Sequence, residues 1–242
     1  MPKNYTGLYT ALITPFNEDK SVDYMALEKL IHEQIEAEVD GLVILGTTGE
    51  SPVISEIEAE KIISLAVKIS KRKIKIIVGA GSNNTELAIE KSKQAQNLGA
   101  DAILSVNPYY NKPPQEGLYE HFKQIADSID IPMILYNIKG RTAVNLEIET
   151  LLRLSLHKNI MGVKEASGDL SQIMDVINQV DDDFFVLSGD DALTYPIMSL
   201  GGHGVISVTS NIFPRDFSPI ASKALSMDSL KFFIPVSSRE AD

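Results

Sequence analysis

Apolar residues recur along the chain in short continuous runs, separated by longer stretches of mixed polarity. A half-exposed strand alternates apolar and polar residues, whereas a continuous apolar run predicts a strand buried on both faces, as in a parallel sheet covered by helices. Eight such runs are found, at residues 7–16, 41–47, 74–81, 101–108, 132–137, 160–166, 184–190 and 204–210.

The stretches between these runs predict amphipathic helices. Residues 23–38 carry leucine and isoleucine at helical spacing behind Asp23, a good N-cap residue. Ser55 followed by Glu58 has the spacing of a capping box, which predicts the start of a second helix. A further helix is predicted after the eighth run, at residues 214–226.

Eight strand and helix units favour a closed (β/α)8 TIM barrel of the α/β class. An open doubly wound sheet usually has fewer strands and often a glycine-rich phosphate turn after its first strand, and no such turn follows residues 7–16. No linker or low-complexity segment interrupts the pattern. We therefore expect residues 1–242 to form a single TIM-barrel domain, with the barrel ending near residue 226 and a short atypical tail at 227–242.

Composition narrows the class of partner. A net charge of −11 opposes binding to nucleic acid or to an anionic membrane, and no apolar run reaches the roughly 20 residues that span a bilayer. The chain has no cysteine, and its first residues lack the apolar run of a signal peptide, which favours a cytoplasmic location. A small-molecule substrate is the expected partner. The four histidines show no metal-binding spacing, so we predict no metal: His32, His121, His157 and His203.

The strongest candidate for chemistry is Lys164, which lies near the end of the sixth run. In a TIM barrel the site lies at the C-terminal ends of the strands. A lysine buried there would have a lowered pKa and a free amine able to attack a carbonyl, which is Schiff-base chemistry. The alternative is a structural ion pair between Lys164 and the adjacent Glu165.

Other strand ends offer polar groups that would converge with this lysine. Glycines flank Thr47 and Thr48, so backbone and hydroxyl groups there could hold a carboxylate, although an ordinary glycine turn has the same composition. Tyr136 lies at the end of the fifth run and Tyr110 follows the fourth, where packed aromatics are also common. Arg141 could bind a carboxylate with two hydrogen bonds, or remain a solvated surface residue.

These segments, in their order and spacing, closely resemble the dihydrodipicolinate synthase family. The resemblance extends from the first strand to the eighth. It rests on residues 46–51, 108–111 with 115–119, 136–137 with 141–142, 162–166, 188–191 and 201–207.

The resemblance implies a class I aldol condensation of pyruvate with L-aspartate 4-semialdehyde, which gives 4-hydroxy-tetrahydrodipicolinate in diaminopimelate and lysine biosynthesis. Pyruvate would form an imine with Lys164, so no further cofactor is implied, and Tyr136 would be the general acid/base. Thr47 and Tyr110 would complete a proton relay, with Tyr110 reaching in from a neighbouring subunit of a homo-oligomer built as a dimer of dimers.

The same resemblance assigns the binding residues. Thr48 would hold the carboxylate of pyruvate, and Arg141 that of the semialdehyde. Gly189 and Ile206 would line the pocket with their backbones. Sialic acid lyases and keto-sugar aldolases share the lysine and the tyrosine, so a related lyase with another aldehyde acceptor is an alternative.

The chain departs from the family pattern at several positions. Lys139 stands where the family usually has proline, which predicts a looser segment around Arg141. The family's feedback lysine ligands are replaced, which predicts weak or absent inhibition by lysine; Tyr109 and Asn83 remain, whereas the changed positions read Pro52, Glu56, Ala59 and Leu87.

The C-terminus is the third departure. Family members continue into a helical region that is largely missing here, since residues 231–236 do not show its pattern. Loss of that region would expose apolar surface and weaken a tetramer. A truncated, inactive barrel that still binds pyruvate is therefore an alternative to an active enzyme.

Overall fold

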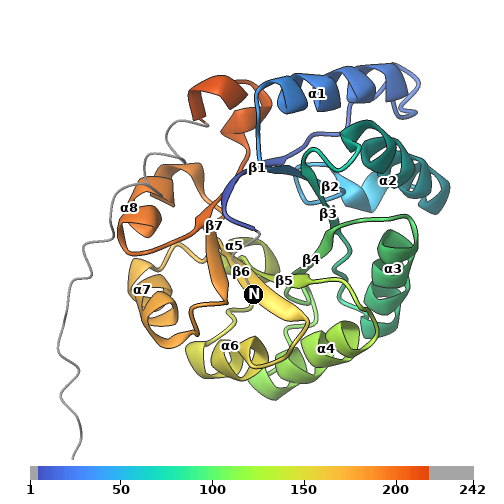
Figure 1. Cartoon of the computed structure of the whole chain (residues 1–242). Coiled ribbons are helices and arrows are strands. Elements are labelled where there is room, and N and C mark those ends of the chain that lie inside the picture. Colours follow the sequence, from blue (N-terminus) through green and yellow to red (C-terminus); the bar gives the residue numbers. More distant parts are fainter. Residues whose placement is uncertain (1–4, 218–242) are drawn as a thin grey trace, which may run out of the picture.

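The computed structural model describes residues 5–217 and shows a closed barrel of eight parallel strands in sequence order (Figure 1). Strand β1 pairs with β2 on one side and with β8 on the other, which closes the barrel. The predicted TIM barrel is confirmed. The strands are β1 Gly7–Ala11, β2 Gly41–Ile44, β3 Lys75–Gly79, β4 Ala102–Val106, β5 Met133–Asn137, β6 Ile160–Glu165, β7 Phe185–Ser188 and β8 Gly204–Ser207.

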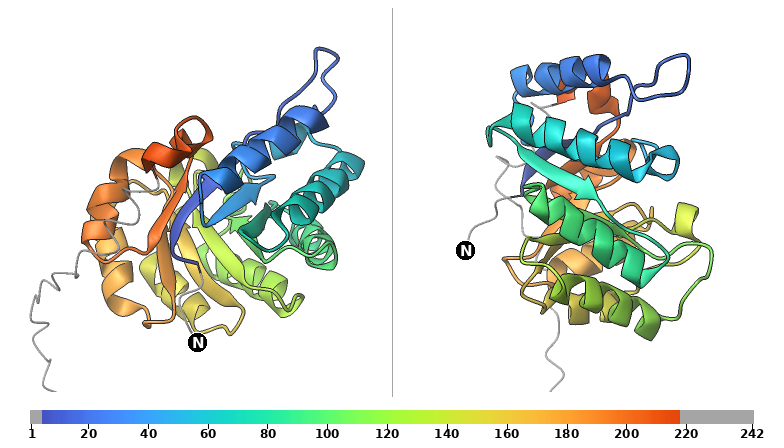
Figure 2. Two further views of the ribbon diagram at one scale, coloured as in Figure 1. Left: turned by 45° about the horizontal axis from the view of Figure 1, so that its top comes forward. Right: turned by 90° about the vertical axis from the view of Figure 1, so that its right-hand side faces the viewer.

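Helices surround the barrel on the outside (Figure 2). Short 3₁₀ helices follow β2, β7 and β8, at η1 Ser51–Val53, η2 Asp191–Leu193 and η3 Thr209–Asn211. The α-helices are α1 Tyr24–Glu36, α2 Glu56–Ser70, α3 Thr85–Asn97, α4 Gln115–Asp127, α5 Lys139–Thr142, α6 Ile148–Ser155, α7 Leu170–Gln179 and α8 Thr194–Ser199.

Both predicted helix starts are observed. The Asp23 carboxylate accepts a hydrogen bond of 2.9 Å from the backbone N–H of Ala26 at the start of α1. Ser55 and Glu58 form the reciprocal capping box of α2. Residues 214–217 are helical, as predicted for 214–226, and the rest of that segment and the tail 227–242 lie outside the described residues.

Several strands end earlier than the apolar runs predicted. The first strand was expected to reach residue 16 but ends at Ala11, because the Ile13 N–H donates to the Asn211 side chain instead of a neighbouring strand and Pro15 has no N–H to donate. The fourth and eighth runs similarly turn into loop or 3₁₀ structure at their ends. These shorter strands leave polar loop residues at the C-terminal mouth of the barrel.

Two hydrophobic clusters hold the fold together. The larger one fills the layer between strands and helices, as the continuous apolar runs predicted. The second fills the barrel interior, where the rings of Tyr5 and Phe185 stack at 5.4 Å between centroids. Within residues 5–217, no helix combines the length and apolarity needed to cross a membrane.

Candidate active site

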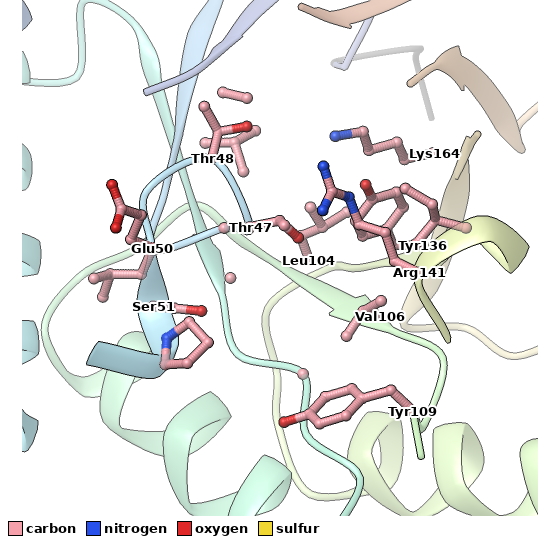
Figure 3. A pocket seen from close by; sticks show the side chains of 18 of the residues that line it. Thr47, Thr48, Glu50, Ser51, Leu104, Val106, Tyr109, Tyr136, Arg141 and Lys164 are labelled. Atoms are coloured by element: carbon pink, nitrogen blue, oxygen red, sulfur yellow. The ribbon is translucent and has the colours of Figure 1, made fainter. Parts of the chain in front are cut away.

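A cavity of about 480 Å³ opens at the C-terminal end of the barrel. Side chains from β5, β6 and α5 form one wall, and the loop after β2 forms the opposite wall (Figure 3). The structure therefore brings most of the predicted site residues together. Those that line the cavity are Thr47, Thr48, Tyr136, Arg141 and Lys164, and Tyr109, noted above as a retained feedback-lysine position, lines it as well.

Lys164 extends from β6 into the cavity and is only 5% exposed. Its Nζ lies 4.4 Å from the centroid of the Tyr136 ring. The pKa of Lys164 is lowered to about 8, mainly by burial; the negative charge of Asp191 opposes the shift, and the positive charge of Arg141 contributes to it. A fall of this size from the ordinary lysine pKa raises the free-amine fraction at neutral pH by roughly 300-fold. The amine is thereby prepared for attack on a carbonyl.

Tyr136 lies beside the lysine because the two residues are register partners on the paired strands β5 and β6. Its side chain forms a hydrogen bond with Thr47 from the loop after β2. Burial raises the pKa of Tyr136, although Arg141 and the bond to Thr47 act in the opposite direction. The phenol is therefore protonated at neutral pH and can donate a proton next to the lysine amine.

Cationic groups gather in the cavity although the chain as a whole is acidic. Arg141 projects from α5 toward Lys164 and Tyr136 (Figure 3), and Lys91 of α3 lines the outer part of the same cavity. Glu50 is the one carboxylate among the described lining residues. This excess of positive charge suits a small anionic ligand. Lys91 was missed from the sequence, because its distance from the strand ends gave no signal.

The remaining predicted residues lie outside the cavity wall. A Cβ added to Gly189 would lie 2.8 Å from Cε of Lys164, so the absence of a side chain there leaves room for the lysine. Ile206 is buried in the barrel interior, in the same cluster as Tyr136. Tyr110 is 89% exposed at the rim, with a left-handed φ of 74°, and does not line the cavity of its own chain.

The alternative of a Lys164–Glu165 ion pair is not observed within residues 5–217. Neighbouring residues on a strand point to opposite faces, so Lys164 enters the barrel while Glu165 points toward the helices. Glu165 instead accepts hydrogen bonds from Asn137 and Ser167. Asp191 is the carboxylate that acts on Lys164, and its Oδ2 also accepts a bond of 2.8 Å from the Thr209 N–H.

The described part of the chain contains no group of three histidine or acidic residues placed to hold a metal. His121 is buried between helices, where its Nδ1 lies 2.9 Å from the Thr85 hydroxyl. Burial lowers the pKa of His121 to about 4. It is therefore neutral at physiological pH and has a packing role on α4.

Comparison with known proteins gives one consistent result. Residues 4–228 match the sequence model of the dihydrodipicolinate synthetase family. The chain is 52% identical over 222 residues to a 4-hydroxy-tetrahydrodipicolinate synthase of Protochlamydia amoebophila, covering 90% of this chain and 74% of that protein.

Solved structures agree with the sequence relatives. The dihydrodipicolinate synthase of Aquifex aeolicus superposes with a TM-score of 0.89 at 45% identity, covering 91% of this chain and 75% of that one. A chloride-inhibited dihydrodipicolinate synthase of Acinetobacter baumannii complexed with pyruvate has a TM-score of 0.90 at 43% identity, covering 93% and 77%.

Proposed function

This chain belongs to the dihydrodipicolinate synthetase family, and from that premise we propose that its cavity performs the family reaction through Lys164. The enzyme is a 4-hydroxy-tetrahydrodipicolinate synthase, a lyase that condenses pyruvate with L-aspartate 4-semialdehyde in the lysine and diaminopimelate pathway. The observation that carries the assignment of the lysine is a buried amine with a lowered pKa beside the Tyr136 phenol. The covalent imine takes the place of a separate cofactor.

The chemistry begins with attack of Lys164 Nζ on the ketone carbon of pyruvate. Water leaves and a protonated imine forms, which is an electron sink that lets the pyruvate methyl lose a proton. The resulting enamine carbon attacks the aldehyde carbon of the semialdehyde. The amine of that substrate then attacks the imine carbon, which closes the ring and releases Lys164.

Tyr136 is the group we assign to proton transfer in these steps. Its hydroxyl is bonded to Thr47, which extends the path toward the cavity opening. In this proposal Tyr110 of a neighbouring subunit completes the relay, which is supported by its 89% exposure at the rim of its own barrel. The smallest complete catalytic unit is then a dimer, and we propose a dimer of dimers as the full assembly.

Arg141 and Thr48 are assigned to the substrate carboxylates. Both line the cavity, and Figure 3 shows them on opposite walls near the lysine amine. We assign Thr48 to pyruvate and Arg141 to the semialdehyde, because a guanidinium can bind a carboxylate with two hydrogen bonds. Gly189 and Ile206 complete the assignment as residues whose backbones line the pocket; Gly189 lies against the Lys164 side chain, and Ile206 belongs to the same buried cluster as Tyr136.

The primary test is to incubate the protein with pyruvate and borohydride, and to map the reduced pyruvyl adduct by mass spectrometry. We expect labelling of Lys164 alone. Lys91 is an internal control, because it lines the same cavity but is exposed and its amine is not buried. Absence of label from Lys164 in folded protein would overturn the proposal and favour an inactive barrel.

A second test concerns the acceptor. Arg141→Ala should keep imine formation but lose use of L-aspartate 4-semialdehyde. Lys139→Ala is a matched control, because Lys139 is a basic residue on the same short helix that does not line the cavity. An unchanged rate for Arg141→Ala would remove the assignment of this residue and favour a lyase with another acceptor.

Three further expectations remain proposals. Residues 1–242 form one domain, with the barrel ending near residue 226. The enzyme acts in the cytoplasm. Millimolar lysine inhibits turnover weakly or not at all, since the changed positions are Pro52, Glu56, Ala59 and Leu87. A steady-state assay with added lysine tests the last point, and abolished turnover would reject it.

A further inference from the structure

A buried polar network lies behind the cavity, on the side of β5 and β6 that faces the helices. We define the Asn137 network as five side chains that form one connected set of hydrogen bonds: Asn107, Asn137, Asn145, Glu165 and Gln172. None of the five lines the cavity. Nothing in the sequence pattern connects these residues, because they come from five separate segments.

Asn137 is the centre of this network, and both the oxygen and the nitrogen of its side-chain amide are fully hydrogen-bonded. Its Oδ1 accepts bonds of 3.0 Å from Asn107 Nδ2 and from the backbone N–H of Leu146. Its Nδ2 donates bonds of 3.0 Å to Asn145 Oδ1 and to Glu165 Oε1. A fully bonded buried amide fixes the position of every segment it touches.

Glu165 is a fully buried carboxylate that has no ion pair among residues 5–217. Its oxygens accept from Asn137 Nδ2, from the Ser167 hydroxyl at 2.7 Å and from Gln172. Burial raises the pKa of Glu165, and these hydrogen bonds act in the opposite direction. A buried acid is costly to keep without a cation, so its donors must be well placed.

Asn137 and Glu165 lie directly next to the reacting groups on their strands. Asn137 and Glu165 are register partners on β5 and β6, one residue beyond the partners Tyr136 and Lys164. Alternation sends the first pair outward and the second pair into the cavity. The Asn137–Glu165 bond therefore fixes the two strand ends that present the phenol and the amine.

Hydrogen bonds of Asn107, Asn145 and Gln172 hold the segment that carries Arg141. This segment, residues 138–147, leaves β5, forms α5 and returns to the network at Asn145 and Leu146. Asn145 Nδ2 donates to Gln172 Oε1 at 2.7 Å, and Gln172 Nε2 donates to the Leu146 carbonyl at 3.1 Å. Asn107 Nδ2 bonds the Val144 carbonyl at 3.2 Å. The far end of the segment is thus anchored to β4, β5 and α7.

We propose that Asn137, Asn145 and Glu165 are positioning residues that set the distance between the Arg141 guanidinium and the imine site at Lys164. This inference rests on the proposed function of Lys164 and Arg141. Because Arg141 itself is exposed, its segment depends on these buried bonds for a fixed orientation. Loosening the network should then impair capture of the second substrate more than formation of the pyruvate imine.

The deciding variant is Asn145→Ala, which removes the bonds to Asn137 and Gln172 at a half-buried site where folding should survive. We expect the KM for the semialdehyde to rise about tenfold, since two hydrogen bonds are lost, with the extent of borohydride trapping of pyruvate at Lys164 unchanged. The matched control is Asn159→Ala. Asn159 donates to the carbonyls of Ala126 and Ile129 at the opposite end of the barrel, so its loss should lower stability without changing the KM.

Glu165→Gln provides a second measurement. It places an amide N–H2 among groups that donate to the carboxylate, so it should disturb the ends of both β5 and β6. We expect slower imine formation as well as a higher semialdehyde KM. If this variant does not fold, the result for Asn145→Ala decides alone.

Two results would overturn the inference. The first is a semialdehyde KM in Asn145→Ala equal to that of Asn159→Ala. The second is equal loss of imine trapping and of turnover in Asn145→Ala, which would indicate a general structural defect. If borohydride trapping leaves Lys164 unlabelled in the wild-type protein, the proposed function itself is wrong. The inference, which rests on that function, is then rejected before any variant is compared.

Discussion

The side chains that point into the barrel differ between its N-terminal end and its C-terminal end. At the N-terminal end, large aromatic side chains fill the space, including Tyr5, Tyr9 and Phe185. At the C-terminal end, the interior opens into a cavity that contains a buried amine, Lys164, and a buried phenol, Tyr136. One barrel therefore has a packed end and a reactive end.

Polar groups also behave differently at the two ends. At the packed end, the carboxylates of Asp40 and Asp101 accept bonds of 2.8 Å from the backbone N–H groups of Leu8 and Ile76, which lie near the starts of β1 and β3. At the reactive end, Lys164 remains available to a ligand. The carboxylates at the packed end are therefore bonded to the backbone, whereas the cavity at the other end contains a buried amine that a substrate can reach.

The largest effect is expected from Lys164→Met. Turnover should fall by about 10³-fold or more, because Lys164 is the one buried lysine among the described residues that line the cavity. The melting temperature at neutral pH should stay the same or rise, since a buried amine is replaced by an apolar group of similar length. Activity assays and thermal unfolding of the purified variant test both points. Retained turnover would show that the reactive end has been misassigned.

Phe185→Ala should have the converse effect at the packed end. The free energy of unfolding should fall by about 3–5 kcal/mol, because truncation leaves a cavity among the barrel-interior residues that the neighbouring side chains cannot fill. Both KM values should remain unchanged. Urea denaturation measures the loss, with Leu156→Ala, a 77% exposed leucine, as a control expected to change little. A large change in KM would contradict the separation of the two ends.

Gly189→Ala tests how closely the reactive end is fitted around the lysine. The new Cβ would lie 2.8 Å from Cε of Lys164, so the amine should shift and turnover should fall about 10- to 100-fold. Gly140→Ala is the control, since a Cβ there meets no atom within 4 Å. Kinetics of both variants give the comparison. Equal rates would mean that the lysine moves without cost to the reaction.

The lowered pKa of Lys164 predicts a pH dependence of imine formation. The initial rate should rise with a midpoint near pH 8, by about fivefold between pH 7 and pH 8, because only the free amine attacks. The free energy of unfolding should also depend on pH through the titration of Lys164. Between the folded pKa of about 8 and the unfolded value of 10.5, the unfolded chain holds the extra proton, so this residue's contribution to stability increases with pH. Lys164→Met should lack that increase in pH-dependent unfolding.

The smallest effect is expected at the entrance to the Arg141 segment. Lys139 is the first residue of α5, a position where proline fits the backbone and no intrahelical N–H bond is lost. Lys139→Pro should raise the free energy of unfolding by about 0.5 kcal/mol and lower the semialdehyde KM slightly. Denaturant unfolding and kinetics test this, and a loss of stability would show that the segment does not accept the fixed φ of proline.

Much of the fold was predictable because its signals are local. Continuous apolar runs identified all eight strands, and the caps at Asp23 and Ser55 identified two helix starts. Strand ends were predicted less well, because the Ile13 N–H leaves the first strand to bond the side chain of Asn211, which is distant in the sequence. Five of the predicted site residues line the cavity, since barrel topology places every strand end on one side: Thr47, Thr48, Tyr136, Arg141 and Lys164.

What the sequence determined by itself was the barrel and its family, and from these it predicted Lys164 and Tyr136 as the central pair of the site. Only the tertiary structure decided that Glu165 faces away from the lysine into the Asn137 network, and that Lys91 lines the outer cavity. The physical reason is the distance along the chain over which each kind of interaction acts. Apolar periodicity and caps act between residues close in the chain, whereas hydrogen-bond partners and pKa values depend on groups that only the closed barrel brings together.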